Sequence, residues 1–255
     1  MKKENSPYFR KFGFELEFST PINDVEKIAK NIINKICGKA KLVTDSNFLI
    51  KNTNYNKWEL KSDGSTECEL TTPISKIKDF NKIKKITEKL KENKVKQTTK
   101  DSVHVHMQAD DVPKHNIIAA WIQIENEIIK CFPKHRRHNT YCQKLIPYNK
   151  KRKIADFFIQ AEEESMQHHS IVSLNYYDDR KTVEFRIMEG NIEINNIMPW
   201  VKFCMLFLNY AKSIDPIEII CRPKNKLKIN DIITELNIND DAIVDFLQRR
   251  IKRFK

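Results

Sequence analysis

The chain has 255 residues, 40% of them hydrophobic, and a formal net charge of +12. This size suits one large domain or two small ones, and we expect a single domain over residues 1–255 with a helical carboxy-terminal extension from about residue 226. The charge is compatible with nucleic acid or another polyanion as a partner. It does not require one, because the lysines are spread along the chain.

The amino-terminal segment and the cysteines favour a cytoplasmic protein. Residues 1–12 include basic side chains but no apolar stretch of the kind that follows them in a secretion signal. The six cysteines form no CxxC pair, which argues against a zinc or disulfide framework. No apolar run reaches the roughly 18 residues of a membrane-spanning helix, so we expect no membrane partner.

The first strand is predicted over 12-FGFELEFST-20, where apolar and polar residues alternate. Side chains of a strand point to alternate faces, so Glu15 and Glu17 would share one face as two like charges. The opposite, buried face would hold Phe12, Phe14, Leu16 and Phe18. Gly13 would leave room beside the two acids, because glycine has no Cβ.

The segment 58-WELKSDGSTECELTTPI-74 predicts two strand arms joined by a Lys-Ser-Asp-Gly-Ser turn. In the second arm, Glu67 and Glu69 alternate with apolar Cys68 and Leu70. Glu67 fits a solvated strand position as well as a site role.

Two later strands repeat the pattern. In 102-SVHVHM-107, His104 and His106 share one face, and in 182-TVEFRIM-188 Glu184 and Arg186 share one face. Any one such strand also fits the solvent-facing side of an antiparallel sheet. Four of them fit it less well, because these polar faces carry acids, histidines and an arginine but no lysine in a lysine-rich chain.

Helical segments separate and follow the strands, with apolar residues at i, i+3 and i+4. They are predicted over residues 21–37, 76–93, 113–131, 152–168 and 195–213. From residue 229 the tail predicts two short helices, the second starting near Asn239.

A polar face with five carboxylates needs counter-ions. Each close pair of carboxylates costs on the order of 4 kcal/mol at an effective dielectric near 20, and divalent cations are the natural compensation. Carboxylates favour Mg²⁺ or Mn²⁺, and a histidine ligand suits Mn²⁺ better; zinc is the minor option. An arginine beside a metal-type glutamate, as in Glu184 and Arg186, suits phosphoryl transfer.

In this order the motifs resemble the amidoligase family of the carboxylate-amine ligase superfamily, which includes glutamine synthetase and glutamate-cysteine ligase. The segment 13-GFELEF-18 resembles its opening G-x-E-x-E strand, and 58-WELKSDGS-65 with 69-ELTTP-73 resembles its W…DGS…E-L-x-[ST]-P block. The segment 102-SVHVHM-107 resembles the family's H-x-H strand, and 136-RRHNTYC-142 resembles its Arg to Tyr-Cys element. The segment 182-TVEFRIMEG-190 resembles its T-x-E-F-R strand. One departure is Asn191, which stands where the family usually has threonine.

The resemblance implies an α+β fold like that of glutamine synthetase, with an antiparallel sheet curved around an ATP site and helices on its outer face. It implies a catalytic group of Asp63, Glu184 and Arg186, in which Asp63 binds the incoming amine or orients a ligand. Nucleotide or phosphate contacts are implied for His106, Arg186 and Arg137. The implied ligands of Mg²⁺ or Mn²⁺ are Glu15, Glu17, Glu69, His104 and Glu184.

The implied activity is ATP-dependent formation of an amide or isopeptide bond through an acyl phosphate. Its partners would be a carboxylate and an amine, with a peptide or protein tail among the candidates. Two alternatives stay open: a metal-dependent nuclease, suggested by Asp45 and 59-ELK-61, and a degenerate ligase domain used for binding. Cys142 is interpreted as a packing residue rather than a nucleophile.

Overall fold

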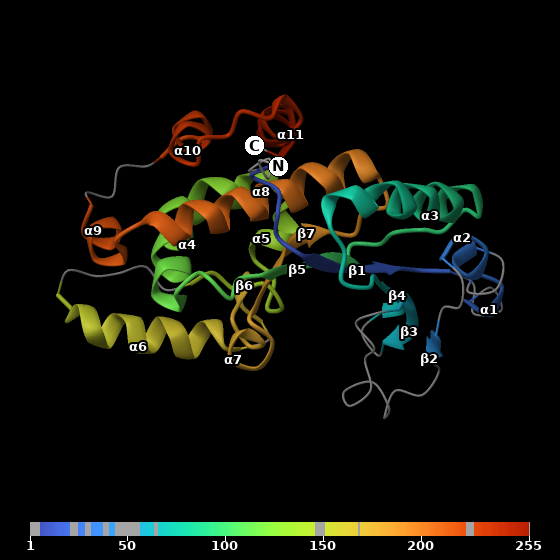
Figure 1. Cartoon of the computed structure of the whole chain (residues 1–255), viewed down its shortest axis with the longest axis horizontal. Coiled ribbons are helices and arrows are strands. Elements are labelled where there is room, and N and C mark those ends of the chain that lie inside the picture. The colour runs from blue at the N-terminus through green and yellow to red at the C-terminus, as the bar shows by residue number, and fades with distance from the viewer. Residues whose placement is uncertain are drawn as a thin grey trace, which may run out of the picture. The chain divides into compact units, whose positions relative to one another are not determined.

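The computed structural model describes residues 6–20, 25–28, 32–37, 41–43, 57–63, 66–145, 151–167, 169–222 and 227–254. Within them the strands are β1 (Phe12–Phe18), β2 (Lys41–Val43), β3 (Glu59–Asp63), β4 (Thr66–Thr71), β5 (Ser102–Gln108), β6 (Val172–Ser173) and β7 (Thr182–Glu189). The helices are α1 (Val25–Ile28), α2 (Asn34–Cys37), α3 (Phe80–Glu92), α4 (Lys114–Ile128), α5 (Lys134–Arg137), α6 (Ile154–Ser165), α7 (Tyr177–Arg180), α8 (Ile194–Ser213), α9 (Pro216–Cys221), α10 (Ile229–Glu235) and α11 (Asp241–Phe254). Two 3₁₀ turns, Ile77–Asp79 and Ile129–Cys131, precede α3 and follow α4 (Figure 1).

The chain divides into two compact units. The β1 unit comprises Lys11–Val105 and Met188–Met198, and the β7 unit comprises Met1–Arg10, His106–Ile187 and Pro199–Lys255. The boundaries fall inside β5 and β7, so each of these strands belongs to both units. The single domain over residues 1–255 stays a prediction.

The fold is α+β, as predicted. The seven described strands are hydrogen-bonded in the order β2-β3-β4-β1-β5-β7-β6. The pairs β1–β4, β3–β4 and β6–β7 are antiparallel. The short strand β2 differs from the antiparallel prediction, because it pairs parallel to β3.

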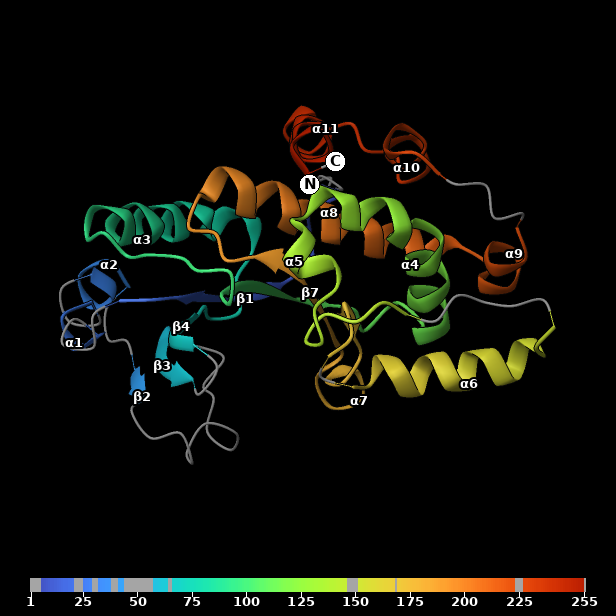
Figure 2. The ribbon, with the colours of Figure 1, turned by 180° about the vertical axis from the view of Figure 1, so that it is seen from behind.

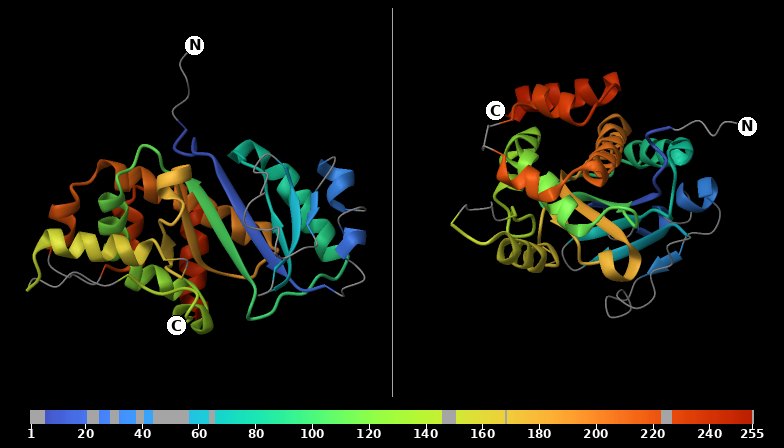
Figure 3. Two further views of the ribbon diagram at one scale, coloured as in Figure 1. Left: turned by 90° about the horizontal axis from the view of Figure 1, so that it is seen from below. Right: turned by 60° about the vertical axis from the view of Figure 1, so that its left-hand side comes forward.

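In the β1 unit, the alternation predicted for the first strand is confirmed. Phe12, Phe14, Leu16 and Phe18 are all buried. The Phe12 ring stacks on Phe80 of α3, with ring centroids 5.2 Å apart, so helix α3 covers the apolar face of this strand. Figure 3 shows β1, β4 and β3 side by side. Their polar side chains therefore lie on the face away from α3.

In the β7 unit, the apolar face of β7 packs against two long helices (Figure 2). The Phe185 ring lies edge-on to Trp121 of α4, with centroids 5.9 Å apart, and to Phe207 of α8, with centroids 5.8 Å apart. All three side chains are fully buried. Glu184 and Arg186, which alternate with Phe185, point to the other face.

Most predicted helices are confirmed within one to three residues of their ends, including α10 and α11 in the tail. Of the helix predicted over 21–37, only residues 25–28 and 32–37 are described, and both parts are helical. Helices α5, α7 and α9 and strands β2 and β6 were not predicted. In the described part of the chain, no helix is long and apolar enough to cross a membrane.

The described glycines differ in the space around them. At Gly190 the backbone comes close to another segment, because a Cβ there would lie 2.7 Å from Cβ of Asp101. Gly13 has no such need, since a Cβ would meet Thr72 only at an ordinary 3.7 Å. Gly38 and Gly64 lie outside the described residues.

Candidate active site

The polar face of the β1 unit is built from two rows that cross β1, β4 and β3. In one row Glu17 faces Glu69, which faces Lys61; in the other, Glu15 faces Thr71, which faces Glu59. Directly opposed side chains of antiparallel strands lie close, with Cβ atoms about 4.5–5.5 Å apart. The rows therefore bring Glu15, Glu17 and Glu69, the three predicted metal ligands from β1 and β4, onto one face.

Glu17 is held by Ser102 at the start of β5. The backbone N–H of Ser102 donates to Oε2 of Glu17 at 2.7 Å, and its hydroxyl donates to the same oxygen at 2.6 Å. A hydroxyl has one hydrogen, so at 2.7 Å the Ser102 oxygen accepts from Nε2–H of His104. Nε2 of His104 therefore carries a proton.

The other ring nitrogen of His104 faces Glu15. Nδ1 of His104 lies 3.3 Å from Oε2 of Glu15. A proton on Nδ1 would make this contact an ion pair with Glu15, and without that proton the nitrogen and the oxygen are two electron-pair donors that a bound cation could share. An imidazole nitrogen together with a carboxylate oxygen suits Mn²⁺, and the carboxylates also suit Mg²⁺. This set of donor atoms therefore fits the predicted cation.

Glu69 is a buried carboxylate with two donors on one oxygen. Nζ of Lys61 lies 3.4 Å from Oε1, and the Thr71 hydroxyl donates to Oε1 at 3.0 Å. Burial, together with the charge of Glu15, raises the pKa of Glu69 to about 8, although Lys61 opposes the shift. Burial alone would lower the pKa of Lys61, but the neighbouring carboxylates, Glu69 first, raise it. Lys61 therefore carries its charge at neutral pH.

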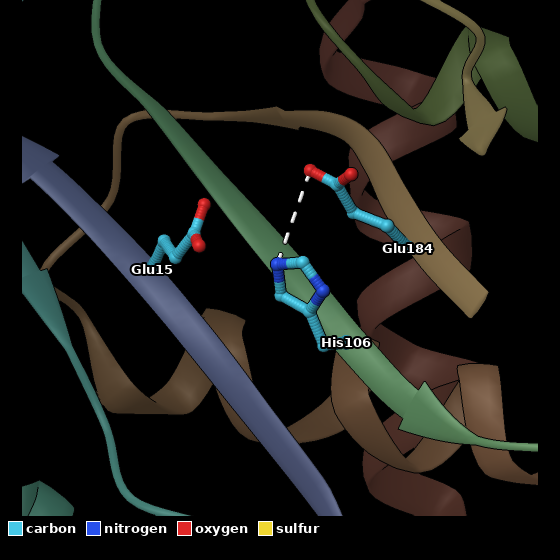
Figure 4. A group of neighbouring side chains, drawn as sticks. All are labelled: Glu15, His106 and Glu184. Carbon is cyan, nitrogen blue, oxygen red and sulfur yellow. Dashed lines mark ion pairs between the residues drawn. The ribbon is translucent and has the colours of Figure 1, made fainter. Parts of the chain in front are cut away.

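In the β7 unit, Glu184 lies between a histidine and an arginine. Nη1 of Arg186 donates to Oε1 of Glu184, and Nε2 of His106 lies 4.0 Å from the same oxygen. Figure 4 shows the pair formed by His106 of β5 and Glu184 of β7, and it also labels Glu15 of β1. Arg136 supports this arrangement from behind, because its guanidinium donates to the backbone carbonyls of Arg186 and Ile187.

A flat ring and a positive charge lie beside His106. The centroid of the Tyr176 ring is 5.9 Å from that of His106, and the Arg180 guanidinium sits 4.4 Å above the Tyr176 ring. His106 was predicted as a site residue from the sequence, whereas Tyr176 and Arg180 were not.

Arg137, a predicted nucleotide contact, binds backbone in the structure. Its guanidinium donates to the carbonyls of Lys130, Phe132 and Phe254, which ties the end of α11 to the turn after α4. Its predicted contact with a nucleotide stays a prediction. The side chains of Asp63 and Glu67 lie outside the described residues, and so does Asp45.

Cys142 is buried, and burial raises the pKa of its thiol to about 12. The thiolate is the reactive form of cysteine, so this environment disfavours a nucleophile and agrees with the interpretation as packing.

Two basic clusters of the sequence, residues 134–138 and 249–255, place arginines in the interior. In residues 134–138, Arg136 is buried on β7 carbonyls; in residues 249–255, Arg250 is buried and donates to the carbonyl of Cys131 at 2.7 Å. These two arginines make contacts inside the fold and do not contribute their charges to an exposed surface that could bind a polyanion.

Besides Tyr176 and Arg180, three side chains of the site were missed from the sequence: Lys61, Ser102 and Arg136. The four strands whose polar faces were predicted to carry no lysine indeed carry none, but the first hairpin arm, 59-ELKSD-63, also alternates and places Lys61 beside Glu69. Ser102 sits two positions before His104, the spacing that puts both on one face of β5. Arg136 carries no such signal beyond its place next to Arg137.

The fold and the site together define a class: an α+β protein whose strands carry acids, histidines and an arginine on one face and pack helices on the other. A model of the family described as "putative amidoligase enzyme" matches residues 9–208. No curated protein matches the chain in a direct search. The family match covers well over half of the sequence, and the chain belongs to this amidoligase family, whose name indicates a ligase that forms amide bonds.

Proposed function

We propose that this protein is an ATP-dependent ligase that uses Mg²⁺ or Mn²⁺ to join a carboxylate to an amine through an acyl phosphate. The observation that carries the proposal is the chain of contacts from Glu17 through Ser102 to His104, which leaves Nδ1 of His104 3.3 Å from Oε2 of Glu15. Such a donor pair on a buried acid face suits a cation better than it suits water.

As the family resemblance implies, the ligands of the cation would be Glu15, Glu17, Glu69, His104 and Glu184. When bound, the cation neutralises phosphate oxygens and so eases transfer of a phosphoryl group to the substrate carboxylate.

Arg186 and His106 would bind the phosphates of ATP. A guanidinium has five N–H donors in a planar fork, so the bond from Arg186 to Glu184 is compatible with a second, phosphate acceptor. Its position on β7 is fixed by Arg136, which limits the reorganisation needed on binding. Asp63 would take the proton of the attacking ammonium or hold the amine.

The sheet order and the helices behind it support a fold related to glutamine synthetase, which we propose together with a cytoplasmic location. The substrates would be a carboxylate and an amine, with a peptide or protein tail as one candidate. With Arg136 and Arg250 buried, a polyanionic partner is not needed to explain the basic clusters.

The test is ADP release by the purified protein from Mg²⁺ and ATP, measured with mixtures of carboxylates and amines. We expect ADP release to need Mg²⁺ or Mn²⁺, to rise with the right pair, and to fall at least about 100-fold in Glu15→Gln and Arg186→Gln. Glu163→Gln, an exposed change on α6, is the matched control and should behave as wild type.

The two alternatives give different results. Cleavage of DNA with Mg²⁺ and without ATP would support the nuclease suggested by 59-ELK-61, two of whose residues, Glu59 and Lys61, are buried on β3. Binding of ATP without turnover under any substrate mixture would support a degenerate ligase domain.

A further inference from the structure

Lys61 is a cation built into the acid face. In the described part of the chain it is the one lysine among the buried side chains, at 8% exposed. It ends the row that runs from Glu17 through Glu69, and its ammonium lies 3.4 Å from Oε1 of Glu69.

The stability of the fold does not by itself explain why an ammonium group is buried here. Burial of a charge is unfavourable unless the charge is paired, and a well-packed apolar pair often serves the fold as well as a buried ion pair. The neighbours of Lys61 are not one partner but a set of acids, since Glu15 and Glu59 also act on it electrostatically. A fixed positive charge in that position changes how many further cations the face can hold.

The carboxylates of the face differ in what they contact. Ser102 links Glu17 to His104, whose Nδ1 lies 3.3 Å from Oε2 of Glu15. Oε1 of Glu69, in contrast, already receives Lys61 and the Thr71 hydroxyl. This oxygen of Glu69 is therefore taken up by protein donors, whereas an imidazole nitrogen beside a carboxylate is a set of atom types that binds a metal.

We propose that Lys61 takes the place of a divalent cation at Glu69, so that this face binds one metal ion fewer than its carboxylates would otherwise hold. The lysine blocks a second cation at Oε1 of Glu69, and the cation that remains is the one that the proposed function assigns to Glu15, Glu17, Glu69 and His104. This inference rests on the metal dependence of the proposed function and adds how the chain limits and places the metal.

The test is binding of Mn²⁺ to the full chain, followed by the electron paramagnetic resonance signal of free Mn²⁺. The variants are Lys61→Met and Lys61→Gln, which remove the charge; Lys61→Arg, which keeps it; and Lys61→Met with Glu69→Gln, which removes both charges of the pair. We expect the two uncharged variants to gain one Mn²⁺ site, or to bind the last Mn²⁺ about tenfold more tightly or better, because an uncompensated carboxylate becomes available. Lys61→Arg and the double variant should keep the wild-type number of sites.

The outcomes separate this inference from the proposed function. Mn²⁺ binding by wild type with no change in number or affinity in the uncharged variants would overturn the role of Lys61 and leave the proposed function standing. Absence of Mn²⁺ binding in wild type and all variants would overturn both. Where an uncharged variant is too unstable to titrate, its melting temperature is measured with and without Mn²⁺. A larger rise than in wild type is expected, and an equal or smaller rise would contradict the inference.

Discussion

Ser102 and Glu17 are joined by two hydrogen bonds that end on the same oxygen. The backbone N–H of Ser102 lies 2.7 Å and its hydroxyl 2.6 Å from Oε2 of Glu17, and both residues are buried. A carboxylate held by one oxygen keeps its orientation while the other oxygen can serve as a ligand. Because the same hydroxyl accepts from His104, one serine orients two predicted ligands.

Removing that hydroxyl should weaken metal binding more than it weakens the fold. In Ser102→Ala, His104 loses the acceptor of its Nε2–H, and we expect Mn²⁺ affinity to fall about 10- to 100-fold. Titration with Mn²⁺ measures the loss. Ser75→Ala, which removes another buried serine hydroxyl of the β1 unit, is the control and should bind Mn²⁺ as wild type does. Equal affinity in both variants would exclude an orienting role for Ser102.

Replacement of Cys142 should leave the chemistry intact. Its thiol is buried and its pKa is raised to about 12, so almost none is ionised at neutral pH. We expect Cys142→Ala to release ADP at a rate within about twofold of wild type and to unfold more easily by about 1 kcal/mol, because a small cavity is left. Loss of turnover in a folded Cys142→Ala protein would contradict this and would point to a covalent role for the thiol.

The buried Glu125 of α4 should make the fold less stable as pH rises. Oε1 of Glu125 accepts from Nε1–H of Trp121 at 2.9 Å and from the backbone N–H of Leu145 at 3.1 Å, yet burial raises its pKa to about 7. The folded state therefore holds the proton more tightly than the unfolded chain, whose pKa is near 4.5. Its stabilising contribution is complete below about pH 4.5 and is lost as pH rises to about 7, a change of about 3 kcal/mol.

Glu125→Gln tests this dependence with little change of shape. The amide oxygen can accept from Trp121 and Leu145 as Oε1 does, but the side chain does not titrate. The free energy of unfolding, measured in urea from pH 4.5 to 8, should fall more steeply with pH in wild type than in Glu125→Gln. Parallel curves would show that Glu125 titrates normally in the folded protein.

An alanine at Gly190 should destabilise the chain. Its Cβ would lie 2.7 Å from Cβ and 3.1 Å from the carbonyl carbon of Asp101, and the N–H of Gly190 donates to the Asp101 carbonyl at 2.8 Å. We expect the free energy of unfolding, measured in urea, to fall by about 1–3 kcal/mol, because the backbone at Gly190 or Asp101 must shift to make room for the Cβ. Gly13→Ala is the control, since its Cβ would meet only Thr72 at 3.7 Å, and it should lose less.

The strands that carry the site could be predicted because they alternate strictly. β1, β5 and β7 each place apolar residues on a helix-covered face, and this period of two fixes which side chains share the other face. The shared faces of Glu15 with Glu17, and of Glu184 with Arg186, followed from that period. Their roles as ligands came from the resemblance to family motifs and stay predictions.

What could not be predicted depends on contacts between distant segments. The pairing of Lys61 with Glu69 needs the register of β3 on β4, which shifts between Lys61 and Asp63. Arg136 rather than Arg137 reaches the carbonyls of β7 because of the way in which helix α5 turns toward that strand. The sequence could not show this, since a helix of four residues is too short to have a periodic pattern. Gly13 and Gly190 both lie beside acidic motifs in the sequence, but a Cβ would come closer than van der Waals contact to another segment only at Gly190.

The most direct measurement of the proposed function is calorimetric titration of the protein with ATP in Mg²⁺ and in EDTA. We expect binding in Mg²⁺, at least about tenfold weaker binding in EDTA, and loss of the Mg²⁺ effect in Glu184→Gln but not in the exposed control Glu163→Gln. ATP binding that is equally tight in EDTA, or unchanged in Glu184→Gln, would contradict a metal-dependent ATP site on this sheet.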